Sequence, residues 1–536
     1  MWYNTGMETK AAETRNGETV TISRAEYELF QAQSERISAL EKQVDLLSEA
    51  LRLSRQKRFG ASSERASEED MEQLSLLFNE AEVYADQAAK EDEGSVTVAA
   101  HKRHKKHEYT LDHLPENMPV KVVEHRLRPE ELVCPKCGST VSEIGKEIRR
   151  RLRLEPAKVV VVEDWYYTYA CRKCEKEDIA TPVVKVAREP NFVPGSFATP
   201  EAVAHLMVQK FVMGSPLYRQ ENEFKRQGIP LKRQTMSNWL VWTAEQLLTP
   251  VYNQLHKELL ARAVLHADET TLQVLHEQDK AAQSKSYMWL YRTSGDTDRP
   301  IVLYEYQPDR KQEHPQKFLT GFQGYLHTDG YTGYHNLPES ITVVGCWAHA
   351  RRKFDEAMKS LPKGKTKSSS AAQGLAYCSL LFKIEEGLAE LSPKERYDQR
   401  LKQAKPVLDA LLAWANTRAA APKSALGRAI TYLKAEWPYL LNYLKDGRLE
   451  LSNNRAERSI KPFVIDRKNF LFANTPSGAT SSAVIFSLIQ TALENGLDPF
   501  RYLSWLMSSA AGMDLSQPEN VQLLLPWNAP TACKAN

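Results

Sequence analysis

Hydrophobic positions near the amino terminus follow the spacing of a long helix. From residue 37 onward they recur at alternating steps of three and four: Ile37, Leu40, Val44, Leu47 and Leu51. This a/d spacing is typical of a coiled coil and predicts pairing with a second copy of the chain, hence a homodimer or higher oligomer. A helix that packs on its own protein is the alternative. Polar sequence flanks the segment on both sides, which favours pairing.

Residues 196–250 also have helical spacing, interrupted twice. A Gly-Ser-Pro break lies at 214–216, and a turn at 228–230 precedes a helix that begins near Gln234. Two helices joined by a glycine-containing turn resemble a helix-turn-helix, whose second helix enters the major groove of DNA. The residues that would face the groove are Arg233, Gln234, Thr235 and Asn238. A helical hairpin without DNA contact is the alternative.

From residue 264 the pattern changes to short apolar runs typical of strands. We expect strands at 264–272, 286–291, 301–306, 325–331 and 341–346, with a helical piece at 315–319. The order strand, strand, strand, helix, strand, strand resembles a ribonuclease-H-like core. In that fold the ends of the first and fourth strands lie side by side.

Residues 361–450 then return to helical spacing, with helices expected at 371–391 and 397–417. We interpret this stretch as an all-helical insertion within the domain that contains the strands. Two interpretations of its role stay open: it positions a partner molecule, or it is structural support alone.

Length and charge limit the possible partners. At 536 residues the chain predicts about three or four domains of ~100–200 residues each. A net charge of +3 means that affinity for nucleic acid must come from local patches, such as the basic run at 101–107. That run is equally typical of a linker. The opening residues show no secretory signal and no apolar run is long enough to span a membrane, so we expect a cytoplasmic protein.

Four of the seven cysteines form two C-x-x-C pairs. The members of these pairs are Cys134, Cys137, Cys171 and Cys174. Two such pairs supply four thiolates in the tetrahedral arrangement that Zn²⁺ prefers. A closed shell of four thiolates leaves no open position for a substrate, so we predict a structural zinc ribbon. Four unrelated free thiols are the alternative.

Two acidic residues follow strand-like runs: Asp268 lies in the first predicted strand and Asp329 ends the fourth. A third, Glu457, lies in a predicted helix that Ser452 or Asn453 would cap. We expect the buried face of this helix to contain Ala456, Ile460 and Phe463, and Pro462 to limit or kink it. Because adjacent side chains on a strand point to opposite faces, Asp268 rather than Glu269 is the predicted ligand.

With these motifs in place, the chain resembles insertion-sequence transposases of the IS66 family, whose catalytic core is a DDE domain. The matching motifs are HADET at 266–270, HTDGYTGY at 327–334, CWAHARRKF at 346–354, NNRAER at 453–458 and RKN at 467–469. The order of the other regions matches as well, so the resemblance covers nearly the whole chain.

The resemblance implies a multidomain α+β protein with a ribonuclease-H-like α/β catalytic core. We expect a coiled-coil region at 1–65, a linker at 66–125, a zinc module at 126–182, a helix-turn-helix-like region at 190–255, a catalytic domain at 256–475 and a helical segment at 476–536. It also implies Asp268, Asp329 and Glu457 as catalytic residues that hold two Mg²⁺ or Mn²⁺ ions.

The implied reaction is metal-dependent DNA cleavage and strand transfer, with accessory proteins of the element as further partners. Candidates for binding phosphate are His349, Arg351, Arg352, Arg455, Arg458, Arg467 and Lys468. We expect the protein in the bacterial cytoplasm, on the nucleoid when it binds DNA. Two alternatives stay open: a nuclease that cleaves without joining, and a catalytically inactive DNA-binding regulator.

Overall fold

The computed structural model describes residues 190–362 and 369–535, together with four short strands. The chain divides into two compact units, one of Met1–Leu74 with Gly195–Ala535 and one of Ser75–Pro194 with Asn536. The predicted coiled-coil helix, the basic run at 101–107 and the four cysteines of the predicted zinc ribbon lie outside the described residues.

The short strands form two antiparallel pairs. In the first unit, β1 (Ala12–Glu13) pairs with β2 (Thr19–Val20). In the second unit, β3 (Thr168–Ala170) pairs with β4 (Val183–Lys185).

A five-stranded mixed sheet is the centre of the first unit. Its strands are β5 (Val264–Gln273), β6 (Lys285–Thr293), β7 (Val302–Gln307), β8 (Gly324–His327) and β9 (Ile341–Val344). Their order across the sheet is β7-β6-β5-β8-β9. The β5–β6 and β6–β7 pairs are antiparallel, whereas β5–β8 and β8–β9 are parallel.

All five predicted strands are present, and helix α8 (Glu313–Phe318) lies where the helical piece is expected. The first and fourth strands are neighbours and run parallel, with His266 opposite His327. The fourth strand is shorter than predicted, because it ends at His327 and leaves Asp329 two residues beyond it. Asp268 and Asp329 therefore each lie two residues after one member of this pair of opposed histidines.

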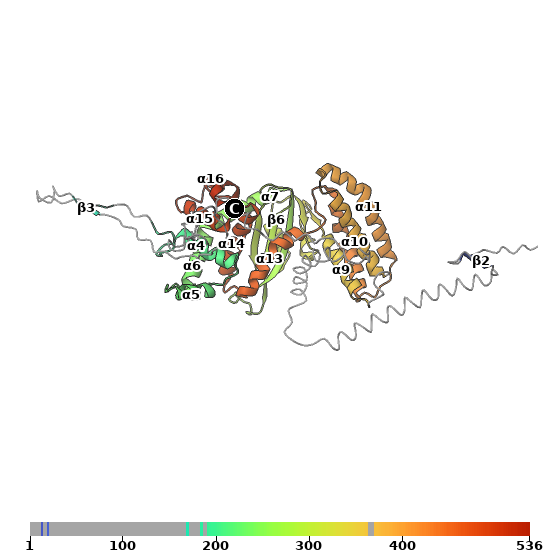
Figure 1. The fold of residues 1–536 in the computed structure, drawn as a ribbon, viewed down its shortest axis with the longest axis horizontal. Helices are drawn as coiled ribbons and strands as arrows, with labels where there is room; N and C mark the ends of the chain where they lie inside the picture. Colours follow the sequence, from blue (N-terminus) through green and yellow to red (C-terminus); the bar gives the residue numbers. More distant parts are fainter. Residues whose placement is uncertain are drawn as a thin grey trace, which may run out of the picture. The chain divides into compact units, whose positions relative to one another are not determined.

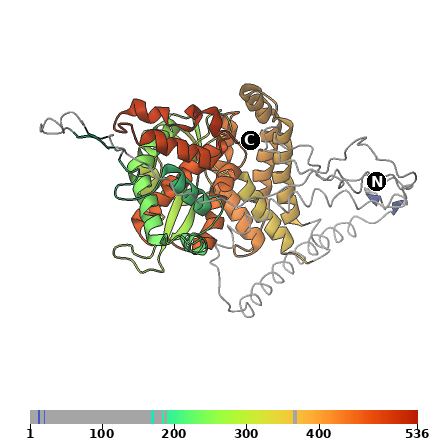
Figure 2. The same ribbon diagram turned by 60° about the vertical axis from the view of Figure 1, so that its left-hand side comes forward.

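Two groups of helices lie on either side of the sheet in both views (Figures 1 and 2). Helix α14 (Pro476–Glu494) packs along the β7 edge of the sheet. Side-chain hydroxyl groups of this helix accept the backbone hydrogen bonds that another strand would otherwise accept. Val302 N–H donates to Thr491 Oγ1 at 3.0 Å and Tyr304 N–H donates to Ser487 Oγ at 2.7 Å. An uncovered edge strand would leave these groups open to another chain, so α14 closes the sheet.

The helices that precede the sheet are α4 (Pro200–Phe211), α5 (Leu217–Arg226), α6 (Arg233–Thr243), the π-helix η3 (Ala244–Leu248) and α7 (Thr249–Leu260). Thr199 caps α4 by accepting a hydrogen bond from Ala202 N–H. The breaks predicted at 214–216 and 228–230 are both present, and Gly214 and Gly228 have positive φ. Such backbone angles strain other residues, which explains why glycine ends each helix.

The segment predicted as a helical insertion is helical. After α9 (Trp347–Lys359) come α10 (Ser370–Gly387), α11 (Pro393–Thr417), α12 (Ala425–Leu440) and the 3₁₀ helix η5 (Leu441–Lys445). These helices pack on the β9 side of the sheet, where Gly345 N–H donates to Tyr439 O and Asn442 Nδ2 donates to Val343 O. Tyr432 of α12 donates from its hydroxyl to Asp329 O at 3.0 Å. The insertion therefore supports the segment that carries one of the predicted aspartates.

Helix α13 (Asn454–Phe470) carries Glu457 and lies against β5 and β6. Ala456, Ile460 and Phe463 are buried, as predicted. Of the two effects expected of Pro462, the first, that it ends the helix, is wrong, because α13 continues for two more turns. Apolar residues before and after the proline are buried in the same interface, and this burial offsets the hydrogen bond that proline cannot make.

The chain ends in further helical elements, as expected for its last segment. These are α15 (Pro499–Ala510), α16 (Pro518–Leu523) and the 3₁₀ helices η6 (Pro526–Asn528) and η7 (Thr531–Cys533). None of the helices within the described ranges has the length and apolar character needed to cross a membrane.

Candidate active site

The three predicted catalytic carboxylates come from three elements that meet at the centre of the sheet. Asp268 lies within β5 and is only 8% exposed. Asp329 follows β8 and is half-buried, with its Oδ1 accepting a hydrogen bond from Tyr331 N–H at 3.0 Å. Glu457 lies in the first turn of α13, with its side chain 17% exposed.

The electrostatics of Asp268 show that these carboxylates act on one another. Burial raises the pKa of Asp268 well above its usual range, and the negative charges of Asp329, Glu269 and Glu457 raise it further. A hydrogen bond from Glu269 N–H, 2.8 Å from Asp268 Oδ1, only partly opposes this effect. Several carboxylates crowded in a buried site form the environment that a bound divalent cation would stabilise.

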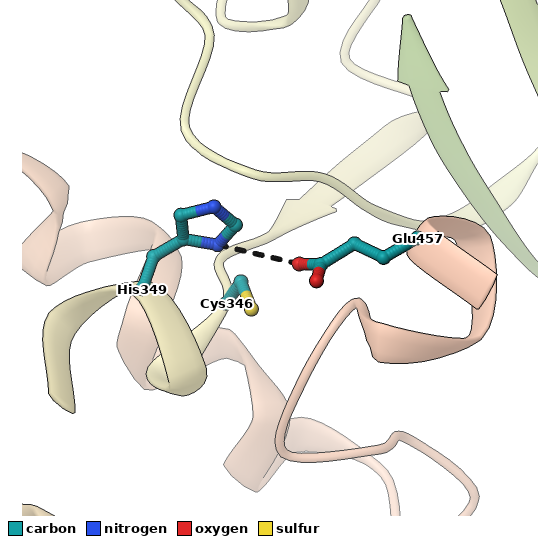
Figure 3. A group of neighbouring side chains, drawn as sticks. All are labelled: Cys346, His349 and Glu457. Atoms are coloured by element: carbon teal, nitrogen blue, oxygen red, sulfur yellow. Dashed lines mark ion pairs between the residues drawn. The ribbon is translucent and has the colours of Figure 1, made fainter. Parts of the chain in front are cut away.

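The side chain of Glu457 lies closer to a different set of ligand atoms. Within residues 190–362 and 369–535, Cys346, His349 and Glu457 form a group whose ligand atoms all lie within 4.8 Å of one another. The three predicted carboxylates do not form such a group. His349 Nδ1 is 3.6 Å from Glu457 Oε1, and both atoms are buried (Figure 3).

Glu269 is a buried acidic residue to which the sequence assigned no role. Its side chain accepts hydrogen bonds from Arg310 Nε at 2.8 Å and from the Tyr334 hydroxyl at 2.6 Å. Burial and the charge of Asp329 raise its pKa to about 7, although Arg310 and Tyr334 oppose the shift. The Arg310 guanidinium in turn lies 3.8 Å from the centre of the Tyr331 ring. Arg310 thus brings positive charge beside the acidic cluster.

Asn453 joins the start of α13 to strand β5. It stands at the predicted cap position, but its side chain makes no capping hydrogen bond. Instead, Nδ2 donates to Ala267 O at 2.8 Å and Oδ1 accepts from His266 Nδ1 at 3.0 Å. The expected capping role is therefore replaced by a tie between the two elements that carry Asp268 and Glu457.

Two histidines lie beneath the aspartates, each two residues before one of them. The rings of His266 and His327 stack with their centres 4.4 Å apart and their planes 12° apart. Both side chains are fully buried, and burial lowers the pKa of each, to about 3 for His266. The two neutral rings therefore pack against each other on neighbouring strands and add no charge to the acidic site.

The residues of α6 predicted to face DNA are on the surface. Arg233, Gln234 and Asn238 are exposed, and Thr235 is half-buried. Gln234 Nε2 donates to Asn238 Oδ1 at 2.9 Å, one helical turn away. These side chains share a face of the helix that is open to solvent.

The other residues predicted to bind phosphate have varied positions. Arg351, Arg458 and Lys468 are exposed, whereas His349 and Arg352 are each only 8% exposed. Arg455 pairs with Glu450 at 2.7 Å. Arg467 donates from Nη1 to Thr271 Oγ1 at 2.5 Å and so connects α13 to β5. The burial or protein contacts of these residues explain their positions without a contact to DNA. They are His349, Arg352, Arg455 and Arg467.

The contacts of Cys346 and Asn453, like those of Glu269, were not predicted from the sequence. Cys346 stands three positions before His349 at the start of α9, a spacing that brings a helix cap and the first turn together. The C-x-x-H pattern was thus a usable signal for a cluster. No comparable signal marked Asn453, because its partners lie almost two hundred residues away in the chain.

Comparison with known proteins gives matches along most of the chain. A family model described as "Transposase IS66 family" matches residues 195–481. A second, for the zinc-finger binding domain of transposase IS66, matches residues 131–175 and includes all four cysteines of the predicted ribbon, which supports structural zinc. A third, described as "Transposase C of IS166 homeodomain", matches residues 46–123.

Relatives among curated proteins include two from Sinorhizobium fredii strain NBRC 101917 / NGR234. The uncharacterized protein y4hP is 32% identical over 422 residues, which is 75% of this chain and 74% of the relative. The uncharacterized protein y4jD is 30% identical over 422 residues, which is 75% and 79% of the two chains. On these matches, the chain belongs to the IS66 family of transposases.

Proposed function

We propose that this protein is a DDE transposase that binds the ends of its element and catalyses metal-dependent DNA cleavage and strand transfer. Asp268, Asp329 and Glu457 are the proposed catalytic residues. The observation that carries the proposal is geometric: Asp268 on β5 and Asp329 just beyond β8 each lie two residues after opposed histidines on adjacent parallel strands, and the helix of Glu457 packs on β5. Burial, together with the charges of Asp329, Glu269 and Glu457, raises the pKa of Asp268 and supports the proposal. Family membership supports the class of reaction.

The topology supports a ribonuclease-H-like core. Three antiparallel strands followed by two parallel ones, in the order β7-β6-β5-β8-β9, put the strands that precede Asp268 and Asp329 side by side. Helix α13, which carries Glu457 in its first turn, packs against β5. The helices α10–α12 separate the second and third carboxylates in sequence while packing against the same sheet.

An all-oxygen donor set in a buried, negatively charged site fits Mg²⁺ or Mn²⁺, both of which prefer carboxylate ligands. When bound, such ions neutralise charge on the phosphate and lower the pKa of the attacking water. Asp268, Asp329 and Glu457 are the residues that would hold them. Asn453 and Arg467 keep α13 fixed on β5, so that Glu457 has a defined position relative to Asp268.

In the proposed reaction, water attacks the phosphorus at the element's end and the P–O3′ bond breaks, which frees a 3′-hydroxyl. That hydroxyl then attacks a target phosphate, and the target strand is the leaving group. Arg458 and Lys468 are exposed on α13 and are suited to neutralise the DNA backbone. The exposed face of α6 is the proposed surface for recognition of the element's end, with Arg233, Gln234 and Asn238 as its contacts.

A strand-joining assay with pre-cleaved element ends tests the proposal. The wild-type protein should join these ends to target DNA in the presence of Mg²⁺, and Asp268→Asn should reduce joining to the background. The isosteric change removes a charge while keeping the shape of the side chain. Asp409→Asn is the matched control, because Asp409 is exposed on α11 and pairs with Lys405 on the same helix. Its joining rate should equal that of the wild type.

Two results would contradict the proposal. Cleavage of intact ends without joining of pre-cleaved ends would identify a nuclease. DNA binding without either reaction would identify an inactive regulator.

A further inference from the structure

The cluster of Cys346, His349 and Glu457 combines three different kinds of metal ligand. A thiol, an imidazole and a carboxylate have their ligand atoms within 4.8 Å of one another, on the first turns of two helices that converge from distant parts of the chain (Figure 3). The proposed transposition mechanism uses only one of the three. The sulfur and the ring nitrogen therefore need a separate explanation.

The spacing of these atoms does not correspond to hydrogen bonding. His349 Nδ1 and Glu457 Oε1 are 3.6 Å apart, and the buried His349 Nδ1 has no hydrogen-bond partner among the described residues. Nitrogen and oxygen ligands of a tetrahedral Zn²⁺ ion, with bonds of ~2.0–2.2 Å, lie ~3.3–3.6 Å apart. The observed distance matches this separation. A buried imidazole nitrogen left without a partner costs free energy unless something binds it.

The sulfur is held in a position from which it can complete the set. Cys346 is fully buried at the cap position of α9, and Asn453 N–H donates to its Sγ at 3.1 Å. Burial and the charge of Glu457 raise the pKa of the Cys346 thiol to about 12, which hydrogen bonds from backbone N–H groups only partly oppose, so a bound cation must displace the thiol proton. Charge also balances, since a thiolate and a carboxylate together neutralise a divalent cation. The nearby Arg352 guanidinium is turned toward Glu356, at 3.6 Å.

We propose that Cys346, His349 and Glu457 form a second cation site, which takes Zn²⁺ or a similar transition-metal ion. Thiolate and imidazole ligands select such ions over Mg²⁺, which prefers oxygen. Three protein ligands leave a fourth position for water. Binding at this site is independent of transposition. One consequence rests on the proposed function: Zn²⁺ would compete with Mg²⁺ for Glu457 and so inhibit strand transfer.

Cobalt binding to the full-length protein tests the site directly, because Co²⁺ bound to thiolate has a charge-transfer absorption band. The four cysteines of the zinc module contribute equally in every variant, so differences between variants report on Cys346. We expect Cys346→Ser to bind one equivalent of Co²⁺ fewer than the wild type. His349→Ala should bind at that site at least about 10-fold more weakly. Cys378→Ser is the control, because Cys378 is equally buried but lies on α10 outside the cluster.

Circular dichroism establishes which variants are folded. Retention of the full cobalt complement and unchanged affinity by a folded Cys346→Ser or His349→Ala protein would overturn the proposal. The two variants give independent answers if one of them fails to fold. The assay contains no DNA, so its result does not depend on whether the protein proves to be a transposase.

Discussion

Single buried charges define the chemistry of this protein at the scale of residues. Asp268, Glu269 and Glu305 are all acidic side chains whose pKa burial raises, but their surroundings differ. Asp268 faces other carboxylates, and Glu269 has the compensating partners Arg310 and Tyr334. Glu305 on β7 lies opposite Trp289 with one buried oxygen that no hydrogen bond satisfies. Only the first of these environments calls for a cation.

The titration of Glu305 predicts a pH dependence of stability. Burial raises its pKa to about 7, from 4.5 in the unfolded chain. The folded state therefore binds the proton more tightly than the unfolded chain does. The stability that this proton contributes is lost as pH rises from about 4.5 to about 7. We expect Glu305→Gln to flatten this decline and to raise the free energy of unfolding at pH 8 by on the order of 2 kcal/mol. This value is lower than the full pKa shift would give, because the side chain is only half-buried and water screens its charge.

Urea unfolding followed by tryptophan fluorescence at several pH values would measure this effect. Glu313→Gln is the control, because Glu313 is exposed on α8. If Glu305→Gln shows the same slope with pH as the wild type, another group causes the decline.

At the scale of elements, the position of α13 on β5 determines where Glu457 lies. The contacts that hold it are specific rather than only apolar: Asn453 bonds to His266 and to Ala267 O, and Arg467 bonds to Thr271. One contact lies at each end of the helix. Together they fix both its place along the strand and its rotation.

Replacement of Asn453 tests this arrangement. Asn453→Ala would leave Ala267 O and a ring nitrogen of His266 without partners in a fully buried site, which costs about 1–3 kcal/mol. We expect the free energy of unfolding to fall by that amount and strand joining to slow even where the protein stays folded. Asn454→Ala, on the partly exposed next residue, should change neither quantity. A wild-type unfolding midpoint for Asn453→Ala would show that the tie does not stabilise the fold.

The order of the strands along the chain was predictable from five apolar runs with strand spacing, and the adjacency of the first and fourth strands followed from the resemblance to a ribonuclease-H-like core. The helical insertion was equally visible in its spacing. Two details were not predictable. The continuation of α13 beyond Pro462 depends on burial against the sheet, and the turn of the Asn453 side chain toward β5 depends on a partner far away in sequence. Local propensity contains neither kind of information.

The same limit applies to the candidate site. The three proposed carboxylates were selected from their positions within or after strands and in a helix, and His349, Arg352 and Arg467 were predicted to bind DNA. In the structure His349 faces Glu457, Arg352 is buried and Arg467 bonds to Thr271. A basic residue on a predicted helix shows its charge in the sequence, but not which side of the helix the fold covers.

At the level of the whole molecule, the described helices and the sheet of the first unit pack together, and the proposed roles divide among them. Helices α4–α6 present the proposed DNA-reading surface, the sheet carries the acidic site, and α10–α12 support the segment of Asp329 through Tyr432. The family assignment extends across these parts, since one family model covers residues 195–481. We therefore expect DNA recognition and catalysis to fail together when the sheet is destabilised.

We propose that Asp268 and Asp329 act as one metal-binding unit in strand transfer. The most direct measurement is the rate of strand joining in Mg²⁺ for Asp268→Asn, Asp329→Asn and the double variant. Residues that act as a unit have non-additive effects, so each single change should lower the rate by at least about 10³-fold and the double variant should lose no more than the worse single. Two results would show that the aspartates do not act as one unit. One is near-normal strand joining by Asp268→Asn, and the other is a double variant whose rate falls by the product of the two single reductions.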